Sequence, residues 1–409
     1  MSEIRVKSTG TIKLFESDNT SSVTIASPAS LGGDRTITIP DADVDLTNVN
    51  SIPTLRPNVN PIIINGNMAV SQRSTSVTGI TGSGYNTIDR FKVGFAMGTW
   101  TQTQESLTSG NAYTDGFSNA LKMDCTTADA SVGSSDRLAL SYNIEGQDLQ
   151  LLKKGTANAE KITISFWVKA TKTGTNILEL YDNDNNRHIS IAYTVSSSNT
   201  WEKKVVNFLA DTSGALGDDN GSSLAINWWM GAGSNFSSGT LGTAWASVTD
   251  ANRAVGQVNH ADSTSNNFHV TGIQLEVGEY TSATIPPFQH ESYGNNLARC
   301  QRYYFNYVEG SGKMVGMSAS YTSTEVVLMH NFPTSMRSAP TLEINTGTNY
   351  YSHGEANSVE GITGSNISID RAQLNGAQFL LTSMSSNQGD AGFLYTGNSS
   401  SKISYTSEL

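Results

Sequence analysis

One strand and the break that follows it, in residues 271–304, constrain the fold of this chain most. Apolar side chains recur there at every second position, which predicts a strand with one buried face. Those side chains are Ile273, Leu275 and Val277. Phe268 and Val270, just upstream, are at even-numbered positions, so in a regular strand they would point to the opposite face. A bulge at Thr271-Gly272 would bring both sets onto one face, because one extra residue turns every later side chain over.

A short helix is predicted after this strand. Pro286 and Pro287 cannot take part in a strand ladder, so the sheet is expected to end before them. Three residues then follow the i, i+3, i+7 spacing of one helix face. They are Leu297, Cys300 and Tyr304. The break predicts a domain junction, with residues 61–290 on one side and residues 291–409 on the other.

The composition favours an all-β protein of two to three domains, at about 100–200 residues per domain. Nine prolines and 37 glycines separate short runs rich in Val, Ile and Thr, a pattern typical of β-sheet proteins. All six tryptophans lie between Trp100 and Trp245, which indicates a core of its own in residues 61–290. We expect a jelly-roll-like β-sandwich there, like those of carbohydrate-binding modules. Residues 291–409 are expected to form the short helix and a smaller C-terminal β domain.

Residues 1–50 are expected to form a β-rich leader. Short strand patterns occur at residues 11–15, 23–26 and 36–39. A segment of this size cannot easily bury a core of its own, so we expect it to pack against sister chains or a docking protein. Residues 51–60 are polar and contain proline, and they are expected to be a semi-rigid linker.

Charge, hydropathy and cysteine content exclude several classes of protein. The formal net charge of −11 argues against nucleic acid as the main partner, since phosphate binding needs clustered Lys and Arg. No apolar run approaches the roughly 18–20 residues that span a bilayer, and the N-terminus lacks an apolar signal segment. Cys125 and Cys300 lie far apart. Two buried free thiols and synthesis in a reducing cytoplasm are therefore expected, rather than a zinc site or a disulfide framework.

Several short motifs resemble segments of bacteriophage tail-fibre proteins. They are NPIIINGNMAVSQRSTS (60–76), DRF (89–91), SFWVKATKTGT (165–175), GIQLEVG (272–278), CQRYY (300–304) and FPTSMRSAPTLE (332–343). A departure is Asn295-Asn296, where such proteins more often carry a Glu, and we expect a loss of helix propensity there. The resemblance implies a phage tail protein of the virion, made in the host cytoplasm, whose leader binds a tail or baseplate protein.

The same resemblance implies a homotrimer that binds host-surface polysaccharide without cleaving it. Two observations on the residues also favour a trimer: the leader is too short to fold alone, and Trp167 lies on the strand face opposite the core. Weak sites repeated in a trimer would act together through avidity. Two alternatives stay open. One is a depolymerising tailspike, which would need a pair of carboxylates about 5–10 Å apart, and the other is a purely structural virion adaptor or decoration protein.

No catalytic signature is evident. The motifs G-x-S-x-G and HExxH are absent and the six histidines are scattered singly, so neither a catalytic residue nor a cofactor is expected. Two acidic loops, 181–188 and 211–223, are rich in possible calcium ligands. In the first, Arg187 stands where a calcium loop needs Gly, and Tyr193 stands where it needs Glu. A hairpin tip is the preferred interpretation of each loop, with a weak calcium site as the alternative.

Two aromatic clusters are predicted to bind glycan, because an exposed ring can stack on a sugar face while nearby Asn and Asp bond its hydroxyls. In the sandwich they are Trp228 and Trp245, where Trp228 and Trp229 would point to opposite faces of one strand. In the C-terminal domain they are Tyr350, Tyr351 and His353. The C-terminal cluster is preferred, because a docked leader would leave that end outward, and its low charge suits a neutral glycan.

Overall fold

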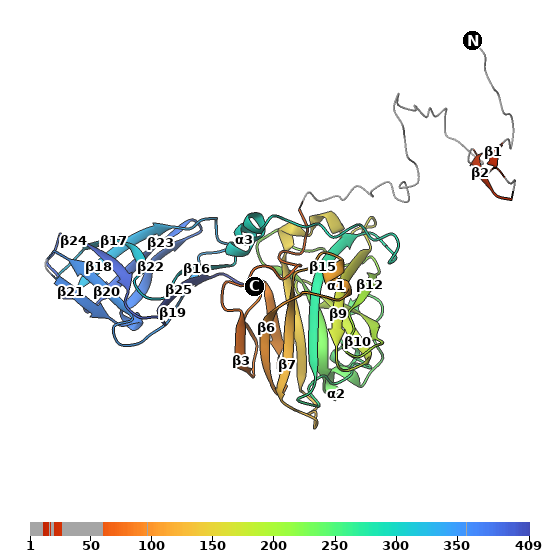
Figure 1. Ribbon diagram of the computed structural model, residues 1–409, viewed down its shortest axis with the longest axis horizontal. Helices are drawn as coiled ribbons and strands as arrows, with labels where there is room; N and C mark the ends of the chain where they lie inside the picture. Colours follow the sequence, from red (N-terminus) through yellow and green to blue (C-terminus); the bar gives the residue numbers. More distant parts are fainter. Residues whose placement is uncertain (1–10, 16, 18–19, 27–59, 96, 357) are drawn as a thin grey trace, which may run out of the picture. The chain divides into compact units, whose positions relative to one another are not determined.

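The computed structural model describes residues 11–15, 17, 20–26, 60–95, 97–356 and 358–409 (Figure 1). The chain divides into two compact units, residues 1–52 and 53–409. In the first unit, β1 (Thr11–Phe15) and β2 (Ser22–Ala26) form an antiparallel pair with Thr11 opposite Ala26. The strand predicted at residues 36–39 and the linker as far as residue 59 lie outside the described residues.

Two antiparallel sheets form a sandwich at the start of the second unit (Figure 1). The six-stranded sheet contains, in spatial order, β12 (Glu202–Phe208), β9 (Ile162–Ala170), β15 (Asn267–Val277), β7 (Asn119–Thr127), β6 (Thr99–Ser106) and β3 (Ser76–Ile80). The seven-stranded sheet contains β14 (Ala246–Ser247), β11 (Arg187–Val195), β10 (Gly174–Asp182), β13 (Ser222–Ala232), β8 (Arg137–Glu145), β5 (Phe91–Phe95) and β4 (Gly84–Tyr85). The predicted all-β sandwich is confirmed.

Short helices connect some of these strands. They are α1 (Asn111–Thr114), α2 (Ser234–Ser237) and the 3-10 helices η2 (Gly146–Asp148), η3 (Gln150–Leu152), η4 (Asp250–Asn252) and, further along the chain, η5 (Gly364–Asn366). Each is only one turn long, so tertiary packing rather than helix propensity must hold it in place.

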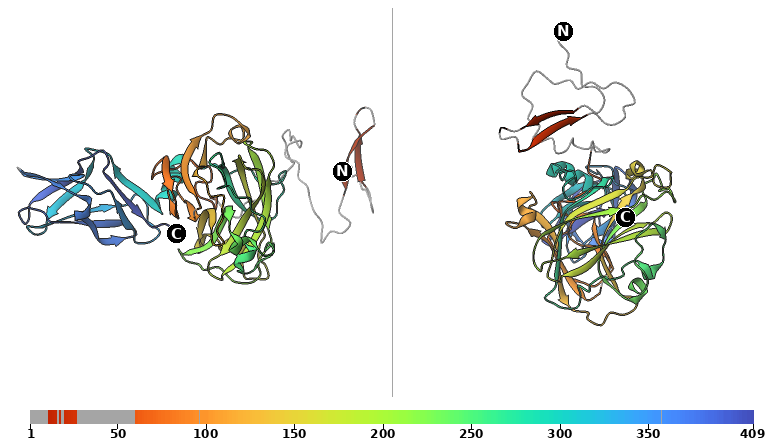
Figure 2. Two further views of the ribbon diagram at one scale, coloured as in Figure 1. Left: turned by 90° about the horizontal axis from the view of Figure 1, so that it is seen from below. Right: turned by 90° about the vertical axis from the view of Figure 1, so that its right-hand side faces the viewer.

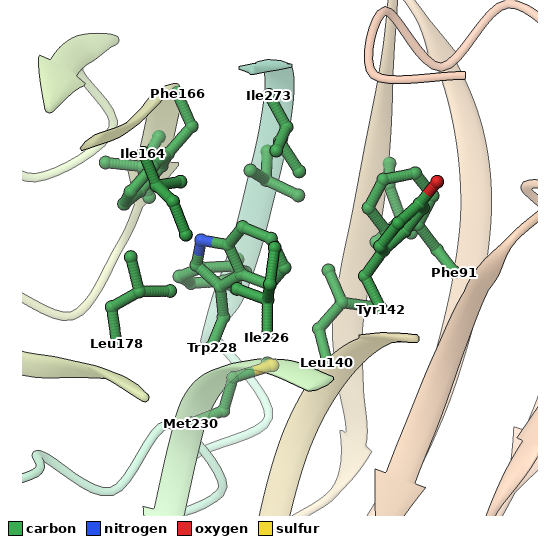
Figure 3. Packing of buried hydrophobic residues seen from close by; sticks show 14 of the residues in the cluster. Phe91, Leu140, Tyr142, Ile164, Phe166, Leu178, Ile226, Trp228, Met230 and Ile273 are labelled. Atoms are coloured by element: carbon green, nitrogen blue, oxygen red, sulfur yellow. The ribbon is translucent and has the colours of Figure 1, made fainter. Parts of the chain in front are cut away.

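The sandwich core lies between the two sheets (Figure 3). Every second side chain of β9 points into it. They are Ile162, Ile164, Phe166 and Val168. Trp228 enters the core from β13 in the opposite sheet and meets Phe166 edge to face, with ring centroids 5.9 Å apart. Full burial of each such side chain contributes about 1.5–3 kcal/mol, so this layer dominates the stability of the sandwich.

The bulge predicted in β15 is present. The pairing of β15 with β9 shifts register between Thr271 and Gln274, and Gly272 has a φ of 61°. Glycine is needed at this position because L side chains rarely adopt positive φ, and a Cβ here would lie 2.6 Å from the ring of Phe117. The loop that contains Gly66 contacts the bulge. The Gly66 carbonyl oxygen accepts the Ile273 N–H at 2.9 Å.

The predicted short helix is α3 (Tyr293–Gln301). The spacing of apolar residues predicts a helix as far as Tyr304, which is longer than the observed one. Ser292 caps its N-terminus by accepting the Asn295 N–H at 3.3 Å. The helix ends before Tyr304, which instead begins a strand. Asn296 has a role beyond helix propensity, because its side-chain oxygen accepts the Asn65 N–H at 3.1 Å. The departure from the usual motif residue therefore coincides with a buried contact to the NPIIINGNM segment.

Residues 304–409 build a second pair of sheets, drawn in blue in Figure 2. The three-stranded sheet contains β16 (Tyr304–Glu309), β25 (Lys402–Thr406) and β19 (Thr341–Ile344). The seven-stranded sheet contains β21 (Ser358–Ile362), β20 (Tyr351–Glu355), β24 (Ala391–Thr396), β17 (Met314–Ser320), β18 (Glu325–Asn331), β23 (Gly376–Thr382) and β22 (Ile367–Gln373). A core of their own, which includes Phe379 and Tyr405, lies among these strands.

Residues from the tail-fibre-like motifs meet where the sandwich joins the C-terminal strands. Gln72 donates its backbone N–H to Asp89 Oδ1 at 2.9 Å and its side-chain amide to the Tyr304 carbonyl at 2.7 Å. Glu408 forms ion pairs with Arg73 at 3.2 Å and with Arg90 at 2.7 Å. Segments far apart in the sequence are thereby joined, so we infer that these motifs specify the junction rather than a ligand site.

Trp167, on the outer face of β9, is covered by its own chain. It packs against the cluster of Phe117 and Trp201, and its indole N–H donates to Asp115 Oδ2 at 2.9 Å. Another subunit is therefore not needed to explain this face, which removes one of the two sequence arguments for a trimer. Trimerisation itself stays a prediction.

Candidate functional site

A groove of about 560 Å³ lies on the outer face of the seven-stranded sandwich sheet. Strand alternation places small polar residues there, because Leu224, Ile226 and Trp228 of β13 point into the core and the residues between them point outward. The lining residues are Lys92, Gly94, Arg137, Ser141, Asn143, Tyr181, Asn183, Ser222, Ala225, Asn227, Arg253 and Leu409. Most of them lie on neighbouring strands, so the hydrogen-bonded sheet fixes their spacing.

The floor of the groove carries positioned hydrogen-bonding groups. Ser141 of β8 lies directly opposite Asn227 of β13, and its hydroxyl donates to Asn227 Oδ1 at 2.7 Å. The Asn227 amide in turn donates to Glu179 Oε2 at 3.1 Å. Asn143 donates its amide to the Leu409 carbonyl at 3.0 Å. These bonds hold the floor side chains in one orientation before any ligand arrives.

Glu179 lies beneath one wall of the groove and holds that wall in place. Its side chain is fully buried and accepts from Arg253 Nε at 2.7 Å, from Arg253 Nη2 at 3.0 Å and from Trp229 Nε1 at 3.1 Å. Burial pushes the pKa of Glu179 up, but the bond from His188 and the charge of Arg253 outweigh burial and hold the pKa below its usual value. Glu179 is therefore a carboxylate at neutral pH, and its paired bonds fix the position of Arg253.

Tyr181 and Arg253 form the wall above this anchor. The Arg253 guanidinium carbon lies 4.8 Å from the Tyr181 ring centroid and 5.4 Å from that of Trp229. The Tyr181 hydroxyl donates to Asn186 Oδ1 at 2.6 Å. With both side chains held from two sides, the wall has a fixed geometry.

The prediction that Trp228 binds glycan is wrong for this fold. Its side chain is 0% exposed because it points into the sandwich core (Figure 3), so no ring face is open to a sugar. Trp229 points to the outer face, as alternation predicts, but Phe236 covers it at a centroid distance of 5.7 Å. Trp245 is partly buried and donates its indole N–H to the Leu209 carbonyl at 2.8 Å. The structure does not bring Trp245 into the groove.

The C-terminal cluster also needs correction. Tyr351 is 0% exposed, because β20 begins at this residue and turns it into the core, where its hydroxyl donates to the Lys402 carbonyl at 2.8 Å. His353, two residues on, points to the same side, is buried and lies 2.9 Å from Ser318 Oγ. Tyr350 is partly buried against the same core. Buried Tyr351 and His353 cannot contact a glycan, and glycan binding by the partly buried Tyr350 stays a prediction.

The two acidic loops meet around the ammonium of Lys154. Its Nζ lies 2.5 Å from Asp182 Oδ2 and 3.0 Å from Asp211 Oδ2. The carbonyl oxygens of Ser213 and Gly214 accept from the same nitrogen at 3.2 and 2.8 Å. The lysine nitrogen thus occupies the centre of the oxygen cage that a calcium ion would need, and the calcium alternative does not fit these loops.

The described part of the chain shows no sign of a metal site, a disulfide or a membrane-spanning helix. None of its His, Cys, Asp and Glu side chains form a group of three or more that could hold a metal ion. Cys125 and Cys300 are free, buried thiols, as expected. None of its helices has the length and apolar character that crossing a membrane requires. A second hollow of about 430 Å³ adjoins α3, and unlike the groove it is lined by a carboxylate, Asp148, beside Arg299 and Arg302.

Sequence reasoning missed the groove because it searched for exposed aromatic rings. The available signal was a set of polar residues inside otherwise apolar strands, namely Ser141 and Asn143 in RLALSYNIE and Asn227 in SSLAINWWMGA. A second signal was Glu179, a single acidic residue in the middle of the apolar run ILEL. Such residues also occur on ordinary solvent-facing strands, so the pattern locates a face without establishing a groove.

Comparison with known proteins gives general similarities only. No protein-family model and no curated protein matches the chain. Among solved structures, the enzymatically active domain of tailspike protein 4 of bacteriophage CBA120 aligns at 12% identity and a TM-score of 0.27, covering 53% of this chain and 21% of that chain. A putative sugar-binding protein of Bacteroides thetaiotaomicron aligns at 12% identity and a TM-score of 0.28, covering 53% of this chain and 100% of that chain. At these values neither similarity assigns a ligand or an activity to this chain.

Proposed function

We propose that this chain is a receptor-binding protein of a bacteriophage tail, which binds host-surface polysaccharide in the groove of the seven-stranded sandwich sheet without cleaving it. The groove carries the binding part of the proposal. Its volume of about 560 Å³ is within the range of small-molecule sites, which is roughly 300–1,000 Å³. The motif resemblance supports the assignment to a phage tail.

Sugar hydroxyls need hydrogen-bonding groups that are already oriented. Asn227 and Ser141 meet this need on the floor, since the bonds to each other and to Glu179 fix their amide and hydroxyl orientations. Preorganised polar groups lose little conformational entropy on binding, which favours affinity from few contacts. A neutral polar floor beside charged walls is therefore suited to a hydroxyl-rich ligand.

Binding without cleavage is part of the proposal. Glycoside hydrolysis normally uses two carboxyl groups that flank the scissile bond. None of the residues that line the groove is Asp or Glu. The carboxylate beneath the wall, Glu179, is buried, and both of its oxygens already accept hydrogen bonds.

We also propose that the chain assembles as a homotrimer through the outer face of the seven-stranded C-terminal sheet. Apolar side chains stand exposed there, and three of them lie on the neighbouring strands β18, β17 and β24. They are Met317 at 72%, Met329 at 77% and Phe393 at 39% exposed. Met317 of β17 lies opposite Phe393 of β24, and β17 pairs on its other side with β18, which carries Met329, so these side chains form one patch.

A second copy of the chain is the occupant that fits this patch best. Each chain carries a net charge of −11, so copies repel wherever acidic surfaces face each other. Neither β17 (MVGMSAS) nor β24 (AGFLYT) contains a charged residue, whereas β18, which carries Met329, has Glu325 at its start. Exposed contiguous apolar surface of this kind typically marks a protein contact, and the uncharged strands β17 and β24 at its centre let identical acidic chains meet. In a trimer the grooves would add avidity to individually weak sites.

Blocking the groove tests the binding proposal. Ala225, a nearly buried floor residue, can be replaced by Leu, which fills the groove and removes no polar contact. The matched control is Ala192→Leu, an exposed position on the same face of β11 outside the groove. We expect labelled Ala225→Leu protein to lose adsorption to host cells at an unchanged melting temperature, while Ala192→Leu adsorbs normally. Equal adsorption by both variants would place the binding site elsewhere, and release of sugar fragments would favour the tailspike.

A further inference from the structure

The charge of the groove is opposite to that of the chain. The chain contains 36 acidic and 25 basic residues. Among the side chains that line the groove the bias is reversed, since three are basic and none is acidic. The basic residues are Lys92, Arg137 and Arg253. Positive side chains collected in a concave site of an acidic protein raise the local concentration of anionic ligands.

Arg253 is held at the wall by carboxylates. Glu179 accepts two of its hydrogen bonds, and Asp250 Oδ1 lies 3.3 Å from its third nitrogen. Because Glu179 neutralises most of this charge from below, Arg253 acts mainly as a positioned donor group.

Arg137 supplies a second cation at the same end of the groove. It lies at the start of β8, with its guanidinium carbon 5.0 Å from the Phe236 ring. Partial burial lowers the pKa of Arg137, and the positive charge of Arg253 lowers it further, while Asp250 and Glu179 act in the opposite direction. Arg253 lies 5.4 Å from the Trp229 ring, and the Trp229 and Phe236 centroids are 5.7 Å apart. Both guanidinium groups therefore border the same pair of rings and would attract an anion bound beside them.

Lys92 of β5 lies beside the groove floor. It lies directly opposite Ser141 in the pairing of β5 with β8, so its charged side chain stands beside the hydroxyl and amide groups of the floor. The Lys92 ammonium lies 5.7 Å from the Tyr85 ring. A ligand that fills the groove therefore meets positive charge at Arg137 and again at Lys92, with uncharged hydrogen-bonding groups between them.

We infer that the groove selects an acidic polysaccharide, one whose sugar units carry carboxylate, sulfate or phosphate groups. The inference rests on the proposed glycan-binding function and adds the ligand class. It replaces the neutral glycan expected at the C-terminal cluster. Arginine is well suited to this task, because its planar fork bonds carboxylate, sulfate and phosphate oxygens in pairs.

The test is calorimetric titration of the full chain with three polymers. Polygalacturonate carries carboxylates, dextran sulfate carries sulfates, and carboxyl-reduced polygalacturonate is the neutral match of the first. We expect at least one acidic polymer to bind about tenfold more tightly than the neutral polymer, with affinity falling as salt rises. Which acidic polymer binds distinguishes the carboxylate source from the sulfate source.

Two variants separate groove recognition from general charge attraction. Arg137→Gln should weaken binding of the acidic polymer about tenfold. Arg371→Gln removes the same charge from an exposed position on β22 and should leave binding unchanged. Equal weakening by both variants would overturn the inference, because it would show non-specific attraction.

The failure of the inference and that of the proposed function have different signatures. If the neutral polymer binds as tightly as the acidic ones, and Ala225→Leu abolishes this binding, the groove binds glycan but the acidic preference is wrong. If Ala225→Leu changes neither polymer binding nor cell adsorption, the groove is not the glycan site and the proposed function itself is wrong.

Discussion

The guanidinium carbon of Arg90 lies 3.4 Å above the ring of Tyr303. The same group pairs with Glu408 at 2.7 Å and donates to the Asn143 carbonyl at 2.6 Å. Arg90 belongs to the DRF motif, Tyr303 to the CQRYY motif, and Glu408 to the last residues of the chain. One buried arginine therefore connects the sandwich, the segment after α3 and the returning C-terminal segment.

Replacing Arg90 should destabilise this junction strongly. Arg90→Met removes a buried cation and leaves Glu408 with one fewer partner. Breaking a buried ion pair from one side costs about 3–5 kcal/mol. We expect a clear drop in melting temperature, measured by calorimetry. Arg371→Met, at an exposed pair, should change stability by at most about 1 kcal/mol. Equal melting temperatures for Arg90→Met and the parent chain would contradict the role of Arg90.

The sandwich and its bulge could be predicted because their signals are local. Alternation in β9 and the change of parity near Gly272 can be read within ten or so residues, and both agree with the structure. The partner of Arg90 could not be predicted, since Glu408 lies 318 positions away. Motif similarity marked these residues as important without saying that their common role is to contact one another.

Lys154 takes the place of a metal between Asp182 and Asp211. Lys154→Ala should leave two buried carboxylates facing each other and cost about 3–5 kcal/mol. The emptied cage of carboxylate and carbonyl oxygens then resembles a calcium site, so millimolar calcium should restore part of the lost melting temperature. The parent chain should not respond to calcium.

The neighbouring residue provides the control for this experiment. Lys153 is exposed and pairs with Glu160 at the surface, so Lys153→Ala should cost at most about 1 kcal/mol and show no response to calcium. A parent chain whose melting temperature rises with calcium would show that the ion binds while Lys154 is present, contrary to the geometry.

Ring burial explains why Trp228 and Tyr351 cannot bind glycan as predicted. Whether an aromatic side chain in a strand is exposed depends on register and on what covers the outer face, and neither is visible in the sequence. Tyr351 and Trp228 both proved to face a core, whereas the groove floor consists of inconspicuous residues such as Ser141 and Asn227. Aromatic enrichment identified well-packed strands instead of a ligand surface.

Tyr351→Ala should therefore act through folding. Truncation of a fully buried aromatic side chain costs about 3–5 kcal/mol, and two hydrogen bonds to carbonyl oxygens are lost as well. We expect a much lower melting temperature, and normal adsorption of whatever protein remains folded. Tyr350→Ala, at a partly buried position, should be milder. A stable Tyr351→Ala protein that no longer adsorbs would restore the C-terminal cluster as a binding site.

Acid should weaken the sandwich through His260. Burial lowers the pKa of His260 from 6.5 to about 4. Between these values the unfolded chain binds more protons than the folded chain, so stability falls as pH falls, by up to about 3 kcal/mol. Urea unfolding at pH 7 and pH 4.5 should show a smaller loss for His260→Gln than for the parent chain.

Asp89 should act in the opposite direction over nearly the same range. Burial raises the pKa of Asp89 from 3.8 to about 6. The folded chain then binds more protons than the unfolded chain between these values, which adds stability as pH falls. Asp89→Asn removes this gain, so its loss of stability between pH 7 and pH 4.5 should exceed that of the parent chain. The same pH dependence in parent and variant would show that Asp89 titrates near its usual pKa.

Formation of the trimer should depend on the exposed apolar face of the seven-stranded C-terminal sheet. Met317 and Met329 stand on the neighbouring strands β17 and β18, with side chains in solvent in the single chain. Met317→Asp places a charge at the centre of the proposed interface, where it would be repeated in every copy and buried without a partner. We expect light scattering to give a trimer for the parent chain at micromolar concentration and a folded monomer for the variant. Leu374→Asp, at an exposed loop position, is the control and should remain trimeric. A stable parent monomer, or a trimer that tolerates Met317→Asp, would show that this face is not the contact.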